Sequence, residues 1–226
     1  GLVLMVVSCL VTLELTGITV SFNSAPLEWW LSLPIIVIYP LLFGWVSYQT
    51  ATKLAEHKRR LQVMSTRDGM TGVYNRRHWE TMLRNEFDNC RRHNRDATLL
   101  IIDIDHFKSI NDTWGHDVGD EAIVALTRQL QITLRGSDVI GRFGGDEFAV
   151  IMSGTPAESA ITAMLRVHEG LNTLRLPNTP QVTLRISVGV APLNPQMSHY
   201  REWLKSADLA LYKAKKAGRN RTEVAA

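Results

Sequence analysis

Two short acidic segments carry the side chains in this sequence that are best suited to phosphate chemistry. The first is Arg142-Phe143-Gly144-Gly145-Asp146-Glu147-Phe148, in which two acids follow directly after two glycines. Glycine accepts positive φ angles without a steric penalty, so such a turn can bring backbone close to a ligand. In the second segment, Asp103 and Asp105 follow an apolar run that begins at Ala97.

These segments predict a magnesium site if the strands that carry them are neighbours. Residues 139–143 and 148–152 have the composition of two short strands, joined as a hairpin across the two glycines. If that hairpin pairs beside the strand that ends at Asp103, the carboxylates of Asp103 and Asp146 converge. Two carboxylates and a backbone carbonyl suit Mg²⁺, which keeps water and substrate phosphates as its other ligands. Taken alone, the segment is equally well explained as a tight turn followed by solvated acids.

The elements around these segments alternate between helical and strand patterns, which predicts an α/β or α+β domain over residues 66–226. Apolar residues at helical spacing mark helices over 79–90, 123–134 and 204–214, the last closed by Gly218. Another helix is expected from Pro156 to about Arg175. Apolar residues alternate with polar or small ones over 182–190, which predicts a half-buried strand. The two cysteines and seven scattered histidines show no zinc or disulfide spacing.

The first 50 residues have a different chemistry. No Lys or Arg precedes Lys53, and residues 2–22 and 29–48 form two almost uncharged runs. Each run is near the ~20 residues that a helix needs to cross a bilayer. Basic residues from Lys53 on predict that this end faces the cytoplasm. We therefore expect a transmembrane hairpin over 1–50 in a multi-pass protein of a bacterial inner membrane, with lipid as a partner. A helical hairpin buried in a soluble protein is the alternative.

The chain also opens at Gly1 inside an apolar run, without an initiator Met, so we expect it to be the C-terminal part of a longer protein. Residues 51–65 are expected to form a helical linker. Leu54, His57, Leu61 and Met64 lie at a and d spacing, which could pair two subunits as a short coiled coil. A solvated connecting helix explains so short a stripe equally well.

Taken together, the motifs from about Asp68 to Asn220 resemble the GGDEF family of diguanylate cyclases. The matching segments follow one another in the order of the family: 68–72 (DGMTG), 75–77 (NRR), 103–108 (DIDHFK), 111–112 (ND), 115–116 (GH), 119–120 (GD), 144–148 (GGDEF), 186–190 (ISVGV), 207–215 and 218–220 (GRN). The resemblance implies a palm-like nucleotidyl cyclase domain with a central, mostly antiparallel sheet flanked by helices. Its activity would be the condensation of two GTP into cyclic di-GMP and two pyrophosphates. The N-terminal part resembles the terminal hairpin of a MASE-type sensor, as in the AdrA-like cyclases.

The resemblance also implies how the metal and the reacting hydroxyl are handled. Asp103, the carbonyl of Ile104 and Asp146 would hold Mg²⁺, with two ions in each site and Mn²⁺ as a substitute. Asp146 or Glu147 would help to deprotonate the attacking 3′-hydroxyl. The sequence leaves the choice between these two acids open, although Asp146 is favoured because it also holds the metal.

Further residues would bind the nucleotide. The resemblance implies that Asn111 and Asp120 read the guanine edge, with His116 nearby. Lys215 and Arg219 would bind the β- and γ-phosphates, with Lys108 assisting. The full set of expected nucleotide-binding residues is Asn111, His116, Asp120, Lys108, Lys215 and Arg219. Each also has an ordinary structural explanation. Asn111 and Asp120 are suitable helix caps, and Lys215 and Arg219 suit a helix C-terminus.

Five residues separate the segment Arg135-Gly136-Ser137-Asp138 from Gly144, the first residue of the signature. Its spacing resembles the family's inhibitory RxxD site, where cyclic di-GMP binds and stops catalysis. Two sites must face each other to make the product, so a homodimer is expected. No nucleic-acid partner is expected. A domain that binds cyclic di-GMP or GTP as a receptor without turnover, and a membrane scaffold, are the alternatives.

Overall fold

The computed structural model describes residues 38–64, 66–177, 179 and 181–225. The chain divides into two units, Gly1–Met64 and Ser65–Ala226, and each is described by itself. In the first unit the described element is helix α3, Tyr39–Met64. This helix continues across the boundary predicted between the hairpin and the linker at residues 50 and 51. Leu54 is exposed on α3, and the other side chains of the predicted coiled-coil stripe lie outside the described ones.

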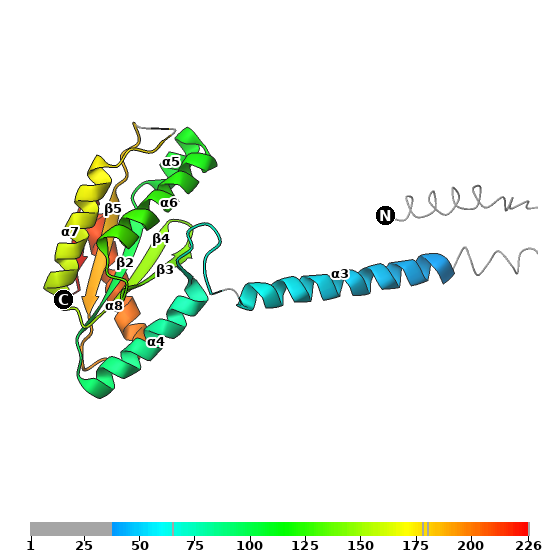
Figure 1. Ribbon diagram of the computed structural model, residues 1–226, viewed down its shortest axis with the longest axis horizontal. Helices are drawn as coiled ribbons and strands as arrows, with labels where there is room; N and C mark the ends of the chain where they lie inside the picture. Colours follow the sequence, from blue (N-terminus) through cyan, green and yellow to red (C-terminus); the bar gives the residue numbers. More distant parts are fainter. Residues whose placement is uncertain (1–37, 65, 178, 180, 226) are drawn as a thin grey trace, which may run out of the picture. The chain divides into compact units, whose positions relative to one another are not determined.

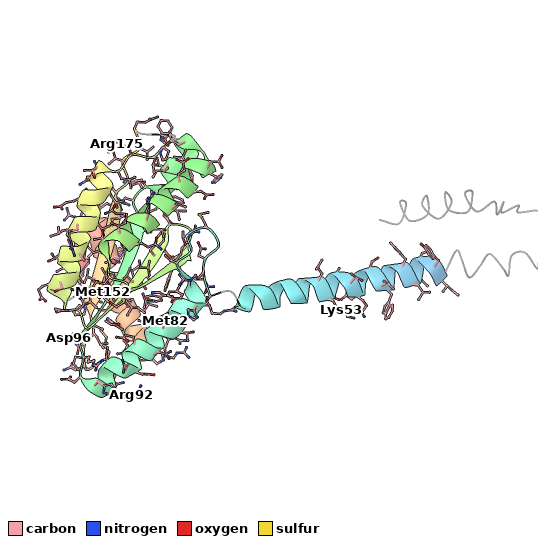
Figure 2. The ribbon with its side chains drawn as sticks, viewed as in Figure 1. Lys53, Met82, Arg92, Asp96, Met152 and Arg175 are labelled. Carbon is pink, nitrogen blue, oxygen red and sulfur yellow. The ribbon has the colours of Figure 1, made fainter. Side chains whose placement is uncertain are left out.

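Among the residues that the structure describes, no helix is both long enough and apolar enough to cross a bilayer. Helix α3 has the length, but polar and charged residues interrupt its apolar run from Ser47 on. Lys53, for example, projects from the helix surface (Figure 2). This finding contradicts the prediction of a multi-pass inner-membrane location, and the expected lipid partner is not shown. Residues 1–37, which carry most of the predicted hairpin and of the MASE-type resemblance, lie outside the described residues.

The second unit is built on a six-stranded sheet with the strand order β1-β3-β4-β2-β5-β6. Strands β2, β3, β4 and β5 of this sheet are labelled in Figure 1. Its four central strands pair antiparallel, whereas β1 and β6 at the edges run parallel to their neighbours. The sheet is therefore mixed, with an antiparallel centre. The strands are β1 Tyr74–Asn75, β2 Ala97–Ile104, β3 Val139–Gly144, β4 Glu147–Ser153, β5 Ile186–Pro192 and β6 Thr222–Val224.

Helices cover both faces of this sheet, and the central strand β2 shows why. All eight of its residues are buried, so its apolar run serves two cores at once. Leu100 and Ile102 point to one core with α6 (His116–Thr133) and α7 (Ala157–Thr173). Leu99 and Ile101 point to the other core with α4 (Arg76–His93) and α8 (Tyr200–Lys216). Because side chains alternate along a strand, Asp103 lies on the α8 side.

Two buried tryptophans fix the helices of that second core. Trp79 on α4 donates its indole N–H to the Val139 carbonyl at 3.0 Å, and Trp203 on α8 donates to Ala191 at 2.8 Å. Both side chains are fully buried. A buried indole needs such an acceptor, so each helix is held against the backbone of one strand as well as by apolar packing.

The expected α/β domain with a sheet flanked by helices is confirmed for the second unit, whereas the transmembrane hairpin of that prediction is not supported. The domain itself differs locally from the prediction. Helix α5, Phe107–Trp114, was not predicted, because its eight residues are too few to show a helical stripe. The strand expected over 182–190 begins only at Ile186, although Val182 and Leu184 are buried. Ile186 pairs with Ile104, the last residue of β2. Residues before Ile186 therefore have no neighbouring β2 residue to pair with. The alternation of apolar and polar residues there reflects which side chains are buried, without a strand.

Candidate active site

The carboxylate of Asp103 lies at the end of β2 and contacts helix α8. Its Oδ2 is 2.7 Å from the ammonium nitrogen of Lys215, and the Asp103 side chain is 10% exposed. Burial raises the pKa of Asp103, the Lys215 ammonium acts against that increase, and the charges of Asp146 and Glu147 add to it. The pKa of Asp103 therefore lies above its ordinary value, chiefly because the side chain is buried. With three carboxylates near one ammonium group, the site carries surplus negative charge.

The hairpin turn of β3 and β4 lies directly beside Asp103. Glu147, the first residue of β4, pairs with Asp103, and the Ile104 N–H faces the Asp146 carbonyl at 3.4 Å. The structure thus brings together Asp103, Ile104 and Asp146, the three residues expected to hold a metal. Within the described part of the chain, no three His, Cys, Asp or Glu side chains form a ready metal-ligand cluster. Glu147 is exposed and Asp146 is half-buried.

Arg142 fastens this turn to the start of the domain. Its Nε and Nη2 both donate to the Gly145 carbonyl, at 3.1 and 2.8 Å, and Gly145 has a φ of 42°. Its Nη1 pairs with Asp68 Oδ1 at 3.1 Å. Burial acts to raise the pKa of Asp68, but hydrogen bonds from Thr71 and the Arg142 charge outweigh it and lower that pKa. Both residues lie in motifs found in the sequence, but no role was expected for either, although an arginine two residues before Gly144 was a usable signal.

The expected guanine-reading residues lie on α5 and α6, two helices that pack together across Gly115. Asn111 lies on α5, and its Oδ1 is buried without a hydrogen-bond partner among the described residues. Gly119 on α6 lies so close that a Cβ atom there would overlap the Asn111 amide. Asp120, the next residue, and His116 are exposed on the same helix. Asn111 and Asp120 therefore lie on two helices that pack together, and the missing side chain of Gly119 lets the Asn111 amide lie against α6.

The three residues expected to bind phosphate differ in their contacts and exposure. Lys215 lies on the last turn of α8 and is already paired with Asp103. Arg219 follows the helix in a turn in which Gly218, Arg219 and Asn220 have φ angles of 110°, 62° and 48°. The Arg219 N–H donates to the Ala214 carbonyl at 3.0 Å and the side chain is exposed. Lys108 is exposed on α5.

Arg135 and Asp138 lie in the turn between α6 and β3. The Arg135 N–H donates to Asp138 Oδ2 at 2.9 Å, and the Asp138 N–H donates to the Arg135 carbonyl at 3.0 Å. Asp138 is buried, which raises its pKa, whereas Arg135 is exposed. Asp138 therefore closes its own turn, and the guanidinium of Arg135 is the part of this segment that solvent reaches.

Known proteins are similar to this chain in sequence and in fold. A family model described as "Diguanylate cyclase, GGDEF domain" matches residues 65–221. Diguanylate cyclase DosC of Escherichia coli K12 is 35% identical over 159 residues, which is 70% of this chain and 34% of DosC. Cyclic di-GMP phosphodiesterase NbdA of Pseudomonas aeruginosa PAO1 is 30% identical over 193 residues, which is 80% of this chain and 25% of NbdA. The chain thus spans about a third of DosC and a quarter of NbdA.

Among solved structures, the GGDEF domain of DgcB from Caulobacter crescentus, in complex with c-di-GMP, superposes with a TM-score of 0.68 at 30% identity. The match covers 71% of this chain and 96% of the DgcB chain. The matching family model covers well over half of the present chain and includes every element from β1 to β5 and α8. The chain belongs to the GGDEF domain family of diguanylate cyclases.

Proposed function

We propose that this domain condenses two molecules of GTP into cyclic di-GMP and releases two pyrophosphates. The observation that carries the proposal is the meeting of Asp103, Asp146 and Lys215 at one end of the sheet. Carboxylates that can hold a cation thus lie beside a cation that can hold phosphate. Relatives that are named diguanylate cyclases support the same activity.

Cyclases of this family generally use Mg²⁺, and the residues of this site suit such an ion. The buried Asp103 carboxylate already attracts one cation, the Lys215 ammonium, and the nearby charges of Asp146 and Glu147 leave negative charge in surplus. Asp103, the Ile104 carbonyl and Asp146 would hold Mg²⁺, or Mn²⁺ in its place, with two ions in a site as the fullest occupancy. The metal would lower the pKa of the 3′-hydroxyl and neutralise charge on the leaving pyrophosphate.

In the reaction the 3′-oxygen of each GTP forms a bond to the α-phosphorus of the other, so two such bonds form. At each α-phosphorus the bond to the oxygen bridging to the β-phosphate breaks, and one pyrophosphate leaves with the bonding electrons. Asp146, or Glu147 beside it, accepts the hydroxyl proton. Lys215 and Arg219, with Lys108, bind the β- and γ-phosphates. Because Lys215 is paired with Asp103, nucleotide binding must exchange one ion pair for another.

Guanine selection is assigned to α5 and α6. The buried Oδ1 of Asn111 has no donor among the residues that the structure describes, and guanine offers an amino donor that adenine lacks at the corresponding ring position. Asp120 would accept from guanine N1–H and N2–H₂ together, with His116 nearby. A site built to pair a substrate's donors rejects analogues without them by a factor of about 10⁴. ATP should therefore be a poor substrate.

Two further features complete the proposal. The exposed guanidinium of Arg135, beside Asp138, would bind the product cyclic di-GMP and stop catalysis, since arginine pairs well with phosphate and with guanine O6 and N7. Each domain binds one GTP, so the active species would be a homodimer with two facing sites and two-fold symmetry.

The competing function is a receptor that binds cyclic di-GMP without making it. The match to NbdA, which is named a phosphodiesterase, favours it, because a GGDEF domain can evidently occur in a protein with another activity. Against it, this chain keeps all five residues Gly144, Gly145, Asp146, Glu147 and Phe148 of the signature.

The deciding experiment incubates the chain with GTP and Mg²⁺ and measures cyclic di-GMP by chromatography. We expect product from the parent protein and none from Asp146→Ala, with circular dichroism showing that both are folded. Asp88→Ala, which removes an exposed acid on α4 away from the turn, is the matched control and should remain active. Binding of cyclic di-GMP without any synthesis by the parent protein would establish the receptor instead.

A further inference from the structure

Asp105 is a buried carboxylate that the proposed mechanism does not use. It directly follows β2 and is 5% exposed. Its Oδ1 accepts from the Ser187 hydroxyl at 2.6 Å, and its Oδ2 accepts from the Asn220 N–H at 2.8 Å. Its own N–H donates to the Arg185 carbonyl at 2.8 Å. Asp105 thus joins the ends of β2 and β5 to the turn that follows α8.

Asp103 and Asp105 contact the two ends of one short segment. Asp103 holds the Lys215 side chain at 2.7 Å, and Asp105 holds the Asn220 backbone at 2.8 Å. Arg219 lies between these anchors. Two carboxylates that are two residues apart therefore bracket the residues that are proposed to bind the nucleotide phosphates.

The turn between the anchors needs a restraint. Arg219 and Asn220 both have positive φ angles, of 62° and 48°. L-residues other than glycine rarely adopt such angles because Cβ crowds the backbone, so the conformation persists only where neighbouring groups hold it. Further along, the Val188 N–H donates to the Arg221 carbonyl at 2.9 Å, and His168 Nε2 lies 3.2 Å from Thr222 Oγ1. These two contacts fix the chain after the turn. Within the turn, the Arg219 N–H donates to the Ala214 carbonyl and the Asn220 N–H donates to Asp105.

We propose that Asp105 is a positioning residue that holds this turn so that Arg219 meets the β- and γ-phosphates of GTP. The proposal rests on the proposed function, because Arg219 has phosphates to bind only if the domain binds GTP. A carboxylate is suited to the task, since its two oxygens accept separately from β5 and from the turn. An asparagine would present an N–H₂ group to one of those two donors.

A first test needs no substitution. Hydrogen exchange of the Asn220 amide, measured by NMR in the parent protein, should be slow because its N–H is bonded to a buried carboxylate. Exchange as fast as that of an unstructured peptide would overturn the proposal, whatever the protein's activity.

The second test measures binding without turnover. The ligand is a GTP analogue with a methylene bridge between the α- and β-phosphates, added with Mg²⁺ and followed by calorimetry. Asp105→Asn should weaken its binding about tenfold, equivalent to about 1.4 kcal/mol. GMP has no β- or γ-phosphate, so its binding should be the same in both proteins. Equal weakening for GMP would mean that Asp105 only supports the fold, and would overturn the proposal.

A double-mutant cycle with Arg219→Ala identifies the residue through which Asp105 acts. If Asp105 positions Arg219, the double variant should bind the analogue no more weakly than Arg219→Ala alone. Losses that multiply would overturn the proposal. Ser187→Ala removes the other hydrogen bond of Asp105 and leaves the one to Asn220, so it is the matched control and should retain binding. If the parent protein makes no cyclic di-GMP, the proposed function fails, while these binding measurements still decide the role of Asp105.

Discussion

The ammonium nitrogen of Lys215 lies 2.7 Å from Oδ2 of Asp103, so the residue expected to bind phosphate is paired with the residue expected to bind metal. In this arrangement the protein supplies its own cation where the carboxylates gather. Binding of a metal–nucleotide complex would replace that contact on both sides, since the metal takes the carboxylate and a phosphate takes the ammonium. Before the substrate arrives, the ion pair offsets part of the negative charge of the site.

The raised pKa of Asp103 predicts a conflict between stability and function. A folded-state pKa above the unfolded value means that ionising Asp103 costs stability, and that this cost disappears as the pH falls below the unfolded value. Asp103→Asn should therefore raise the melting temperature at pH 7 without metal, and raise it less near pH 3, while it abolishes cyclic di-GMP synthesis. Thermal unfolding at the two pH values checks this. A stabilisation that does not depend on pH would contradict it.

Gly119→Ala should disturb guanine binding without unfolding the protein. The new methyl group would overlap the Asn111 amide, which must rotate away. Alanine favours a helix over glycine by about 1 kcal/mol, so the melting temperature should not fall much. We expect the KM for GTP to rise about tenfold, or ~1.4 kcal/mol. Gly44→Ala on α3, where a Cβ meets nothing within 4 Å, is the matched control and should leave the KM unchanged. An unchanged KM in Gly119→Ala would argue against Asn111 as a base reader.

Arg142→Ala should loosen the signature turn. It removes two exposed hydrogen bonds to the Gly145 carbonyl and the partly buried ion pair with Asp68. Hydrogen bonds to charged groups contribute about 1.5–3 kcal/mol, so urea unfolding should show a loss of about that size. Because the pKa of Asp68 is lowered in the folded state, the part due to Asp68 should be present at pH 7 and lost as the pH falls through that pKa. A loss that is the same at pH 7 and pH 2.5 would show that Asp68 is not its source.

Arg135→Ala should relieve product inhibition and leave the initial rate nearly normal. Its guanidinium is exposed, and the turn contacts of this residue come from its backbone. Asp138→Ala should relieve inhibition too, but should also destabilise the domain, because Asp138 is buried and accepts from the Arg135 N–H. Progress curves with added cyclic di-GMP separate the two variants. Inhibition of Arg135→Ala equal to that of the parent would mean that the spacing of Arg135 and Asp138 is incidental.

The proposed homodimer predicts that cyclase activity depends on the concentration of the protein. Two GTP molecules must be presented face to face, so turnover by residues 65–226 alone should rise faster than linearly with protein concentration. Sedimentation under the same conditions reports the fraction of dimer, and specific activity should follow that fraction. Specific activity that stays constant where the protein is monomeric would exclude this assembly.

Local patterns in the sequence determined much of the domain. The apolar run that ends at Asp103 had to be buried on both faces, and the Gly144-Gly145 pair between two apolar segments had to turn as a hairpin. The hydrophobic stripes of α4, α6 and α8 were visible because each helix has 17 or 18 residues, long enough to repeat its period. Short elements such as α5, β1 and β6 escaped, since two to eight residues do not establish a period.

The contacts between distant segments were decided only by the tertiary structure. Sequence spacing cannot show that Lys215 meets Asp103, that Arg142 reaches back 74 residues to Asp68, or that Asn220 donates to Asp105 across 115 residues. Such pairs depend on strand order and helix packing, which place residues together whatever their separation along the chain. The type of a residue determines which chemistry its side chain can perform. Its burial and its partners in the folded structure determine its charge, its orientation and its role.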